Sequence, residues 1–245
     1  MGNPKIVSIV GITASGKSSL GIKLAQEFNG EIISCDSRQV YKNLDIGTAK
    51  VTKQQQALVP HHLIDVVDVG KTFNVFDFQK LAYAAIDDVL ARGKLPILVG
   101  GSGLYSRSIV EGYVFARSEA TKQSRNNPKY NVLQICLVPP RDIVEPLVVK
   151  RIDERLEQGM IKETEDLIDK GISKDWLRSL GLEYYWNVLY IEGNVDIDEY
   201  KRQLKNKTMQ FIKRQRTWYR KEKDTVYLTD DFYKKSRKLI ADFLA

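Results

Sequence analysis

The sequence predicts an α/β fold, in which a parallel β-sheet is flanked by helices. Three observations lead to this prediction. Short apolar segments alternate along the chain with longer amphipathic segments of helical period. The first apolar segment runs into a glycine-rich turn and then a helix, as in a strand–turn–helix unit. Two later apolar segments also end in polar or glycine-rich turns, and in an open α/β sheet such turns meet at the carboxyl ends of the strands.

The first strand, Lys5 to Val10, leads into a turn that fits the phosphate-binding pattern G-x-x-x-x-G-K-[ST]. The residues expected to bind the phosphate groups of a ligand are Gly11, Thr13, Ala14, Ser15, Gly16, Lys17 and Ser18, and the loop alone does not say which phosphates these are. Glycines let the backbone N–H groups converge on a polyanion at the start of the next helix, Ser18 to Phe28. Lys17 adds a positive charge, and the Ser18 hydroxyl suits a Mg²⁺ ion that bridges phosphate oxygens. A chance glycine turn is the alternative, and the flanking strand and helix argue against it. The predicted fold is therefore P-loop NTPase-like.

A second strand, Glu31 to Cys35, delivers Asp36 at its carboxyl end. Asp36 is therefore expected to face the phosphate loop. The alternative is that Asp36 only caps the next helix. A polar loop from Asp45 to Lys50 comes next, and a short third strand is predicted from His61 to Val67.

The remaining elements of the core are predicted from helix caps and apolar runs. They are a helix from Asn74 to Gly93, a strand from Pro96 to Val99 with a glycine turn at Gly100 to Tyr105, a polar loop from Gly112 to Asn131, and a strand from Asn131 to Val138. The second glycine turn is expected to face the same crevice as the phosphate loop. The strand before it delivers no carboxylate to hold a metal, which argues against a motor-type ATPase.

The C-terminal part has mainly helical periodicity. Helices are predicted from Arg141 to Gly171 with a break at Gly159, from Trp176 to Ile191, from Asp196 to Lys223 and from Asp230 to Leu244, with a last strand from Thr225 to Leu228. Residues 1–140 and 200–245 are assigned to a P-loop catalytic core, and residues 141–199 to a small helical subdomain.

Composition limits the class of protein. A chain of 245 residues with 43% hydrophobic residues can bury a full core. It has no run of about 20 apolar residues, so no membrane span is expected, and the first strand begins too early for a signal peptide. Cys35 and Cys136 lie in separate apolar segments, which favours reduced core cysteines over a disulfide, and the two adjacent histidines do not suggest a zinc site. A cytoplasmic monomer is expected.

The formal charge of +7 suggests an anionic partner, and most of the excess lies in one segment. Between Lys201 and Lys223 there are ten Lys or Arg residues and one acidic residue, Glu222. A charged helix is usually a solvated surface, but acidic residues are then normally interspersed at i and i+4. The segment is therefore predicted to face an anion.

Several motifs occur together and in a fixed order. They are Gly11 to Ser18, Asp36-Ser-Arg-Gln-Val-Tyr-Lys42, Asp45-Ile-Gly-Thr-Ala-Lys50, His61-His-Leu-Ile-Asp65, Gly100-Gly-Ser-Gly-Leu-Tyr105, Arg151-Ile-Asp-Glu-Arg155 with Gly159, Gly181-Leu-Glu183, and Lys213-Arg-Gln-Arg-Thr-Trp-Tyr-Arg220. With these residues the chain resembles the tRNA dimethylallyltransferases, also called tRNA isopentenyltransferases. The phosphate loop alone is unspecific, but its combination with the motifs at Asp36 and Asp45 is close to diagnostic.

The resemblance implies transfer of a five-carbon allyl group from dimethylallyl diphosphate to the exocyclic N6 amine of an adenine beside the anticodon. The catalytic residues it implies are Asp36, Lys17 and Ser18. Asp36 takes the proton of the amine, while the loop, Lys17 and a Mg²⁺ ion on Ser18 stabilise the leaving diphosphate. The adenine must leave its stack to reach a cleft. The residues expected to bind tRNA are Asp36, Ser37, Arg38, Gln39, Ser102, Lys213, Arg214, Gln215, Arg216, Trp218 and Arg220, and the helices from about 141 to 192 are expected to grip the anticodon arm.

The chain departs from the family pattern in one interval. Members usually carry some tens more residues, including an Arg-rich helix that contacts tRNA, between the Gly-Leu-Tyr turn and the helix that matches Arg151. Here only the polar loop from Gly112 to Asn131 and one strand occupy this interval. The difference bears on the strength and selectivity of tRNA binding and leaves the catalytic motifs complete.

Three other functions stay open at this point. An isopentenyltransferase acting on free AMP, ADP or ATP fits the shorter interval, although a mononucleotide needs no basic segment such as Lys201 to Lys223. The second is a small-molecule P-loop kinase in which Asp36 activates a hydroxyl. The third is a non-catalytic RNA-binding protein with a vestigial phosphate loop, and the presence together of Lys17, Ser18 and Asp36 argues against it.

Overall fold

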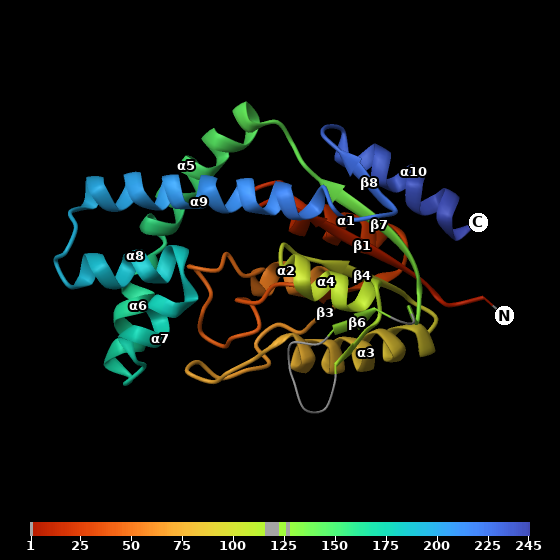
Figure 1. The fold of residues 1–245 in the computed structure, drawn as a ribbon, viewed down its shortest axis with the longest axis horizontal. Coiled ribbons are helices and arrows are strands. Elements are labelled where there is room, and N and C mark those ends of the chain that lie inside the picture. The colour runs from red at the N-terminus through yellow and green to blue at the C-terminus, as the bar shows by residue number, and fades with distance from the viewer. Residues whose placement is uncertain (1, 116–122, 126–127) are drawn as a thin grey trace.

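The computed structural model describes residues 2–115, 123–125 and 128–245. At its centre is a parallel sheet with the spatial order β3-β2-β4-β1-β7-β8 (Figure 1). Its strands are β1 (Lys5–Gly11), β2 (Gly30–Ser34), β3 (His61–His62), β4 (Leu95–Val99), β7 (Asn131–Leu137) and β8 (Thr225–Leu228). All neighbouring strands in this sheet pair in parallel. The predicted α/β fold with a parallel sheet is confirmed.

Helices cover both faces of the sheet, because apolar side chains alternate between the two faces of each strand. Val7 and Ile9 of β1 belong to the core on one face, and Ile6 belongs to the core on the other. The helices involved are α1 (Lys17–Glu27) and α10 (Phe232–Leu244) on the first face, and α3 (Val75–Ala91) and α4 (Gly103–Val110) on the second, with the short α2 (Lys53–Leu58) beside α1. The central strand is thus buried on both sides, which fixes the position of the loop at its carboxyl end.

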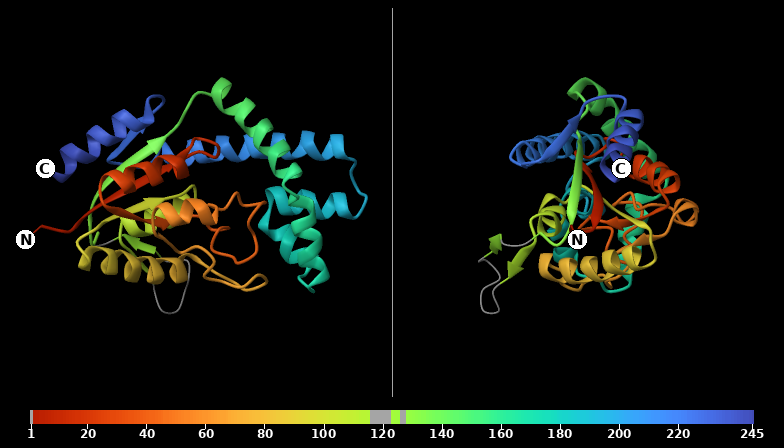
Figure 2. Two further views of the ribbon diagram at one scale, coloured as in Figure 1. Left: turned by 180° about the vertical axis from the view of Figure 1, so that it is seen from behind. Right: turned by 90° about the vertical axis from the view of Figure 1, so that its right-hand side faces the viewer.

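A group of helices lies beyond the carboxyl ends of the strands (Figures 1 and 2). These helices are α5 (Arg141–Glu157), α6 (Met160–Asp169), α7 (Lys174–Leu180) and α8 (Leu182–Ile191). The predicted break at Gly159 is confirmed: this glycine has a φ of 94°, and α6 begins directly after it. A residue with a side chain would be strained in this conformation.

The long helix α9 (Ile197–Tyr219) connects the helical group with the sheet. Near its start, Tyr200 and Leu204 pack in one cluster with Val148 of α5. At its end, Tyr219 packs against Val10 of β1. The division of the chain into a catalytic core and a helical subdomain stays a prediction, and α9 runs through its boundary at residue 200.

Two predicted elements are wrong in their extent. The single helix from Trp176 to Ile191 is divided at Gly181, whose φ of 75° ends α7 before α8 begins. The predicted third strand to Val67 is also too long. Only His61 and His62 pair with β2, and Val67 makes an isolated bridge to Tyr41.

The polar loop predicted from Gly112 to Asn131 contains paired strands. β5 (Tyr113–Phe115) and β6 (Gln123–Arg125) form an antiparallel ladder. Residues 116–122 and 126–127 of the predicted loop lie outside the described residues. The helix α4 was also absent from the prediction, because its glycine-rich start suggested only a turn.

Other expectations from composition can be compared with the structure. Cys35 and Cys136 are buried and free, as predicted. In the described ranges, none of the helices has the length and apolar character needed to cross a membrane.

Candidate active site

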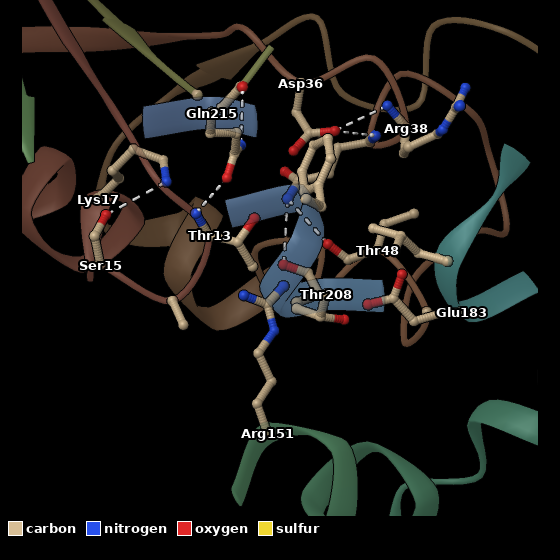
Figure 3. Close-up of a pocket in the computed structure, with 18 of the residues that line it drawn as sticks. Thr13, Ser15, Lys17, Asp36, Arg38, Thr48, Arg151, Glu183, Thr208 and Gln215 are labelled. Atoms are coloured by element: carbon tan, nitrogen blue, oxygen red, sulfur yellow. Dashed lines mark hydrogen bonds between the residues drawn. The ribbon is translucent and has the colours of Figure 1, made fainter. Parts of the chain in front are cut away.

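The phosphate loop and Asp36 open into one large cavity of about 1300 Å³ at the carboxyl edge of the sheet (Figure 3). Three loops that follow β1, β2 and β4 form one wall of this cleft, and helices α5, α8 and α9 form the other. From the sequence-predicted set, the residues that line it are Thr13, Ala14, Ser15, Gly16, Lys17, Ser18, Asp36, Ser37, Arg38, Gln39, Ser102, Arg214 and Gln215. The structure therefore brings most of the predicted site residues to one place.

The phosphate loop is held in a compact turn by its glycines and by α9. A Cβ on Gly11 would lie 2.3 Å from the Leu137 carbonyl oxygen, so only glycine fits there. Gly11 is the last residue of β1, and it is not among the residues that line the cleft. The side-chain oxygen of Gln215 accepts a hydrogen bond of 2.8 Å from the Thr13 N–H. Gly16 has a φ of 82° and α1 begins at the next residue, so the start of the helix faces the cleft.

Lys17 is folded back over the phosphate loop. Its ammonium group donates to the Ile12 carbonyl oxygen at 2.6 Å and to the Ser15 hydroxyl at 3.4 Å. Burial, with a smaller contribution from the nearby charge of Arg151, lowers the pKa of Lys17 to about 8. An anion bound in the cleft would favour the charged form and reverse part of this shift.

Asp36 forms a tight turn with the residues that follow it. Its Oδ1 accepts hydrogen bonds from the Arg38 N–H at 2.8 Å and the Gln39 N–H at 3.3 Å. These bonds organise a turn, and no helix begins there, so Asp36 is not the cap of a following helix. Within the described part of the chain, Oδ2 receives no hydrogen bond, which leaves this oxygen available to a ligand in the cleft.

Ser102 joins the turn after β4 to the turn that contains Asp36. Its hydroxyl oxygen accepts from the Ser37 N–H at 2.9 Å, and it lies 3.2 Å from the Ser37 hydroxyl. The side-chain amide of Gln215 also reaches this region and donates to the Gly101 carbonyl oxygen at 3.1 Å. Gln215 is only 6% exposed, and it connects the phosphate loop to the second glycine turn.

Arg151 is a cleft residue that the sequence did not single out as a site residue. It points from α5 into the cleft, opposite the phosphate loop (Figure 3). Its buried Nε has no hydrogen-bond partner in the described residues, and burial together with the charge of Arg155 lowers the pKa of Arg151 to about 10. Arg155, one turn further on, pairs with Glu183 at 2.6 Å. A buried guanidinium with free donors is suited to bind an anion.

The four-residue spacing of Arg151 and Arg155 was the available signal, since it puts both side chains on one side of a helix. Sequence alone does not say which way that side faces. The same is true of Lys207, which lines the cleft next to Thr208 and Phe211 from α9.

Part of the predicted basic segment lies away from the cleft. Lys213, Arg216, Trp218 and Arg220 are not among its lining residues. Arg216 donates to the Pro139 carbonyl oxygen, and the guanidinium of Arg107 lies 4.3 Å from the centre of a Trp218 ring. The structure thus gives these two residues packing contacts within the protein.

The basic segment has few acidic residues of its own, but two of its lysines have acidic partners on another helix. Lys201 pairs with Asp153 at 2.8 Å, and Lys205 pairs with Glu145 at 2.7 Å. Both acidic residues come from α5, so the pairing depends on how two helices pack and cannot be read from the i and i+4 positions of one helix.

Ser18 is the residue expected to hold a metal ion at the phosphate loop. In the described ranges, His, Cys, Asp and Glu side chains form no group of three or more that could hold a metal. Ser18 is exposed at the start of α1 and lines the cleft. This arrangement fits Mg²⁺, which often binds through phosphate oxygens, water and few protein ligands.

Two protein-family models match the chain. One described as "IPP transferase" matches residues 39–126 and 115–222. One described as "Isopentenyl transferase" matches residues 4–67. The two pieces of the first match meet at residues 115–126, inside the interval where the sequence predicts a shortened region.

Curated relatives match over most of their length. A protein named tRNA dimethylallyltransferase from Caldicellulosiruptor saccharolyticus is 34% identical over 285 positions, with 91% of each chain covered. One of the same name from Streptococcus agalactiae serotype Ia is 34% identical, with 98% of each chain covered. Because the first alignment has 285 positions and this chain has 245 residues, at least 40 positions of that relative have no counterpart here. The chain is therefore shorter than this relative, as predicted, and the place of the missing positions between residues 105 and 151 stays a prediction.

A solved structure has the same fold. The tRNA isopentenylpyrophosphate transferase from Bacillus halodurans superposes with a TM-score of 0.86 at 31% identity, and the match covers 98% of this chain and 95% of the other.

Proposed function

This chain belongs to the tRNA dimethylallyltransferase family, and from this membership we propose the reaction of its cleft. The enzyme transfers a dimethylallyl group from dimethylallyl diphosphate to the N6 amine of an adenine next to the anticodon of tRNA. One observation carries the proposal: an anion-binding loop and the carboxylate of Asp36 open into the same cavity.

The diphosphate binds at the phosphate loop in this proposal. The N–H groups at the start of α1 point toward the cleft, and Lys17 and Arg151 contribute positive charge from opposite sides. A Mg²⁺ ion bound to Ser18 and to phosphate oxygens would neutralise charge that develops on the leaving diphosphate. These groups stabilise the transition state more than the ground state, because the leaving group gains charge as the C–O bond breaks.

Asp36 acts as the general base. The lone pair of an aromatic amine is delocalised into the ring, so loss of its proton during attack assists the reaction. The N6 nitrogen forms a bond to C1 of the allyl group, and the C1–O bond breaks with its electron pair leaving on the diphosphate. The N6 proton passes to the free Oδ2 of Asp36, whose other oxygen is fixed by the N–H groups of Arg38 and Gln39. No phosphoryl group moves.

The size and lining of the cleft fit two substrates. At about 1300 Å³ it exceeds the range of about 300–1,000 Å³ usual for one small ligand. A flipped nucleotide can therefore enter beside the allyl diphosphate. Lys207 and Arg214 flank the opening together with the aromatic ring of Phe211, a combination suited to phosphates and unstacked bases. These residues favour tRNA over free AMP, ADP or ATP as the acceptor.

We further propose that the enzyme acts as a monomer in the cytoplasm, where tRNA is modified. All groups assigned to the reaction come from one chain, so no second copy is needed. Size-exclusion chromatography with light scattering checks the monomer directly.

A labelled-substrate assay tests the proposed function. The protein is incubated with Mg²⁺ and dimethylallyl diphosphate labelled in its allyl group. The acceptors, in separate reactions, are unmodified tRNA, an anticodon stem-loop, the same stem-loop with guanine at the target position, AMP and ATP. We expect label in tRNA and in the adenine stem-loop, and none in the guanine control. Label in AMP or ATP alone would indicate the mononucleotide enzyme, and consumption of ATP without transfer would indicate a kinase.

A further inference from the structure

Glu163 of α6 binds the backbone of a loop that borders the cleft. Its Oε2 accepts hydrogen bonds from the N–H groups of Asp45 at 2.8 Å and Ile46 at 2.7 Å. Its Oε1 accepts from the Gly47 N–H at 3.1 Å and from the Tyr184 hydroxyl at 2.7 Å. Three successive N–H groups therefore converge on one carboxylate, as they do around a bound anion.

The loop packs closely against α8 at Gly47. A Cβ on Gly47 would lie 2.6 Å from the Tyr184 ring, so the backbone is in direct contact with α8. Tyr184 is 2% exposed and packs in the core cluster that also contains Leu180 and Val188. Burial and the adjacent Glu163 raise the pKa of Tyr184, which keeps its hydroxyl protonated as a donor.

Lys50 fastens the other end of the same loop. Its ammonium group donates to the Tyr41 carbonyl oxygen at 2.7 Å, to Asp45 at 2.6 Å and to Asp65 at 2.5 Å. The Lys50 side chain is only 4% exposed. The segment from 45 to 50 is thus held at one end by the half-buried Glu163 and at the other by the buried Lys50.

The middle of the loop contacts the residues around Asp36. The side-chain amide of Gln39 donates to the carbonyl oxygens of Thr48 at 3.4 Å and Ala49 at 3.3 Å. The backbone N–H of Gln39 donates to Asp36. A continuous series of contacts therefore runs from Glu163 through the loop and Gln39 to the general base, and it does not pass through the phosphate loop.

We infer that Glu163 is a positioning residue, which holds the adenine side of the cleft in place from the helical group. This inference rests on the proposed function, because it assigns the base to Asp36. Glu163 does not itself line the cleft. It acts by fixing residues 45–49, which in turn fix Gln39 and the orientation of the Asp36 carboxylate.

Glu163→Gln is the variant that tests the inference. A glutamine offers one acceptor oxygen in place of two, so some of the three backbone N–H groups lose their partner. Asp169→Asn is the matched control, because it removes the same charge from an exposed position on the same helix. Steady-state kinetics of both variants and of the parent protein are measured with dimethylallyl diphosphate and tRNA, together with amide hydrogen exchange at residues 39 and 45–47.

We expect Glu163→Gln to lower kcat between about tenfold and a hundredfold, the usual effect of a small misplacement of a reacting group. The KM for dimethylallyl diphosphate should stay at the parent value, and exchange at 45–47 should accelerate. Asp169→Asn should match the parent. If the glutamine variant does not fold, Glu163→Asp, which keeps the charge on a shorter side chain, takes its place.

Two outcomes would overturn the inference. An unchanged kcat with faster exchange at 45–47 would show that Glu163 holds the loop, but that the loop does not position the Asp36 carboxylate for the reaction. A rise in the KM for dimethylallyl diphosphate that accounts for all loss of activity would place the defect on the diphosphate side. Failure of the proposed function is recognised separately, because the parent protein itself would then transfer no dimethylallyl group. The exchange data would still show whether Glu163 fixes the loop as far as Gln39.

Discussion

At the scale of single residues, the cleft separates two tasks. Lys17 and Arg151 bring positive charge to the anion-binding side, and Asp36 brings a carboxylate with one free oxygen to the other. The hydrogen bonds to Oδ1 of Asp36 fix the direction of Oδ2. A base held in this way needs little reorganisation when it takes a proton.

Replacing Asp36 by Asn should slow the reaction without weakening tRNA binding. The amide cannot accept the N6 proton, so we expect kcat to fall by about 10²–10⁴, the usual contribution of a general base. Single-turnover rates and a filter-binding measurement of the Kd for tRNA check the two parts. Asp142→Asn, at an exposed position, is the control. A normal rate for Asp36→Asn would remove Asp36 from the role of base.

The pKa of Lys17 predicts how substrate binding depends on pH. With a pKa of about 8, the free enzyme loses the Lys17 charge as the pH rises through this value. We therefore expect kcat/KM for dimethylallyl diphosphate to decline above about pH 8. In the unfolded chain Lys17 keeps its proton up to about pH 10.5. Below pH 8 the folded protein also holds this proton, and burial of the charged group lowers the free energy of unfolding by its full amount. Between pH 8 and 10.5 the folded protein loses the proton first, so the free energy of unfolding rises again. A kcat/KM that stays level from pH 7 to 9.5 would contradict the assignment.

At the scale of elements, α9 combines three contributions in one helix. Its start packs with α5 and α8, its middle presents Lys207, Phe211 and Arg214 to the cleft, and Gln215 joins two loops of the sheet. These residues follow one side of the helix, because successive members of the series 200, 204, 207, 211 and 214 or 215 lie three or four positions apart.

The salt dependence of tRNA binding should distinguish the cationic residues of α9. Arg214 lines the cleft, whereas Lys201 is already paired with Asp153. We expect Arg214→Ala to reduce the slope of log K against log salt concentration by about 1, the value for one lost phosphate contact. Lys201→Ala should change the slope less. Equal slopes for the parent protein and Arg214→Ala would show that Arg214 makes no phosphate contact.

Gln215 should prove important for both stability and diphosphate binding. Its two hydrogen bonds connect Thr13 with Gly101, and it is almost fully buried. Gln215→Leu leaves both backbone groups without this partner, so we expect a loss of about 1–3 kcal/mol in the free energy of unfolding. We also expect a higher KM for dimethylallyl diphosphate. Gln215→Glu keeps the acceptor for Thr13 but loses the donor to Gly101 and adds a negative charge beside the phosphate loop, so it should raise the KM further. Parent-like values for Gln215→Leu would exclude the bridging role.

The elements also show what sequence can and cannot predict. The phosphate loop and the sheet were predictable, because they depend on local glycines and on short apolar runs such as Lys5 to Val10. The break at Gly181 was missed, since apolar periodicity continues across it. Arg151 was missed as a site residue, and so were the partners of Lys201 and Lys205, because the packing of α5 against α9 decides where these side chains point.

At the scale of the whole molecule, the chain is shorter than a curated relative, yet its phosphate loop and Asp36 still open into one cleft. At least 40 positions of one curated relative are absent, and the two pieces of the family match meet at residues 115–126. The sheet, the phosphate loop and the helices around the cleft lie outside this interval. A shortening at this interval, as the sequence predicts, leaves the proposed chemistry intact and concerns the surface that surrounds the cleft.

The central claim is that one cavity holds the leaving diphosphate and deprotonates the adenine. A crystal structure with Mg²⁺, an unreactive analogue of dimethylallyl diphosphate and an anticodon stem-loop tests it most directly. We predict the diphosphate at the N–H groups of the phosphate loop and the flipped adenine with N6 within about 3.2 Å of Asp36 Oδ2, the reach of a general base. An adenine whose N6 lies beyond hydrogen-bond reach of Asp36, or a diphosphate bound away from Lys17, would contradict the account.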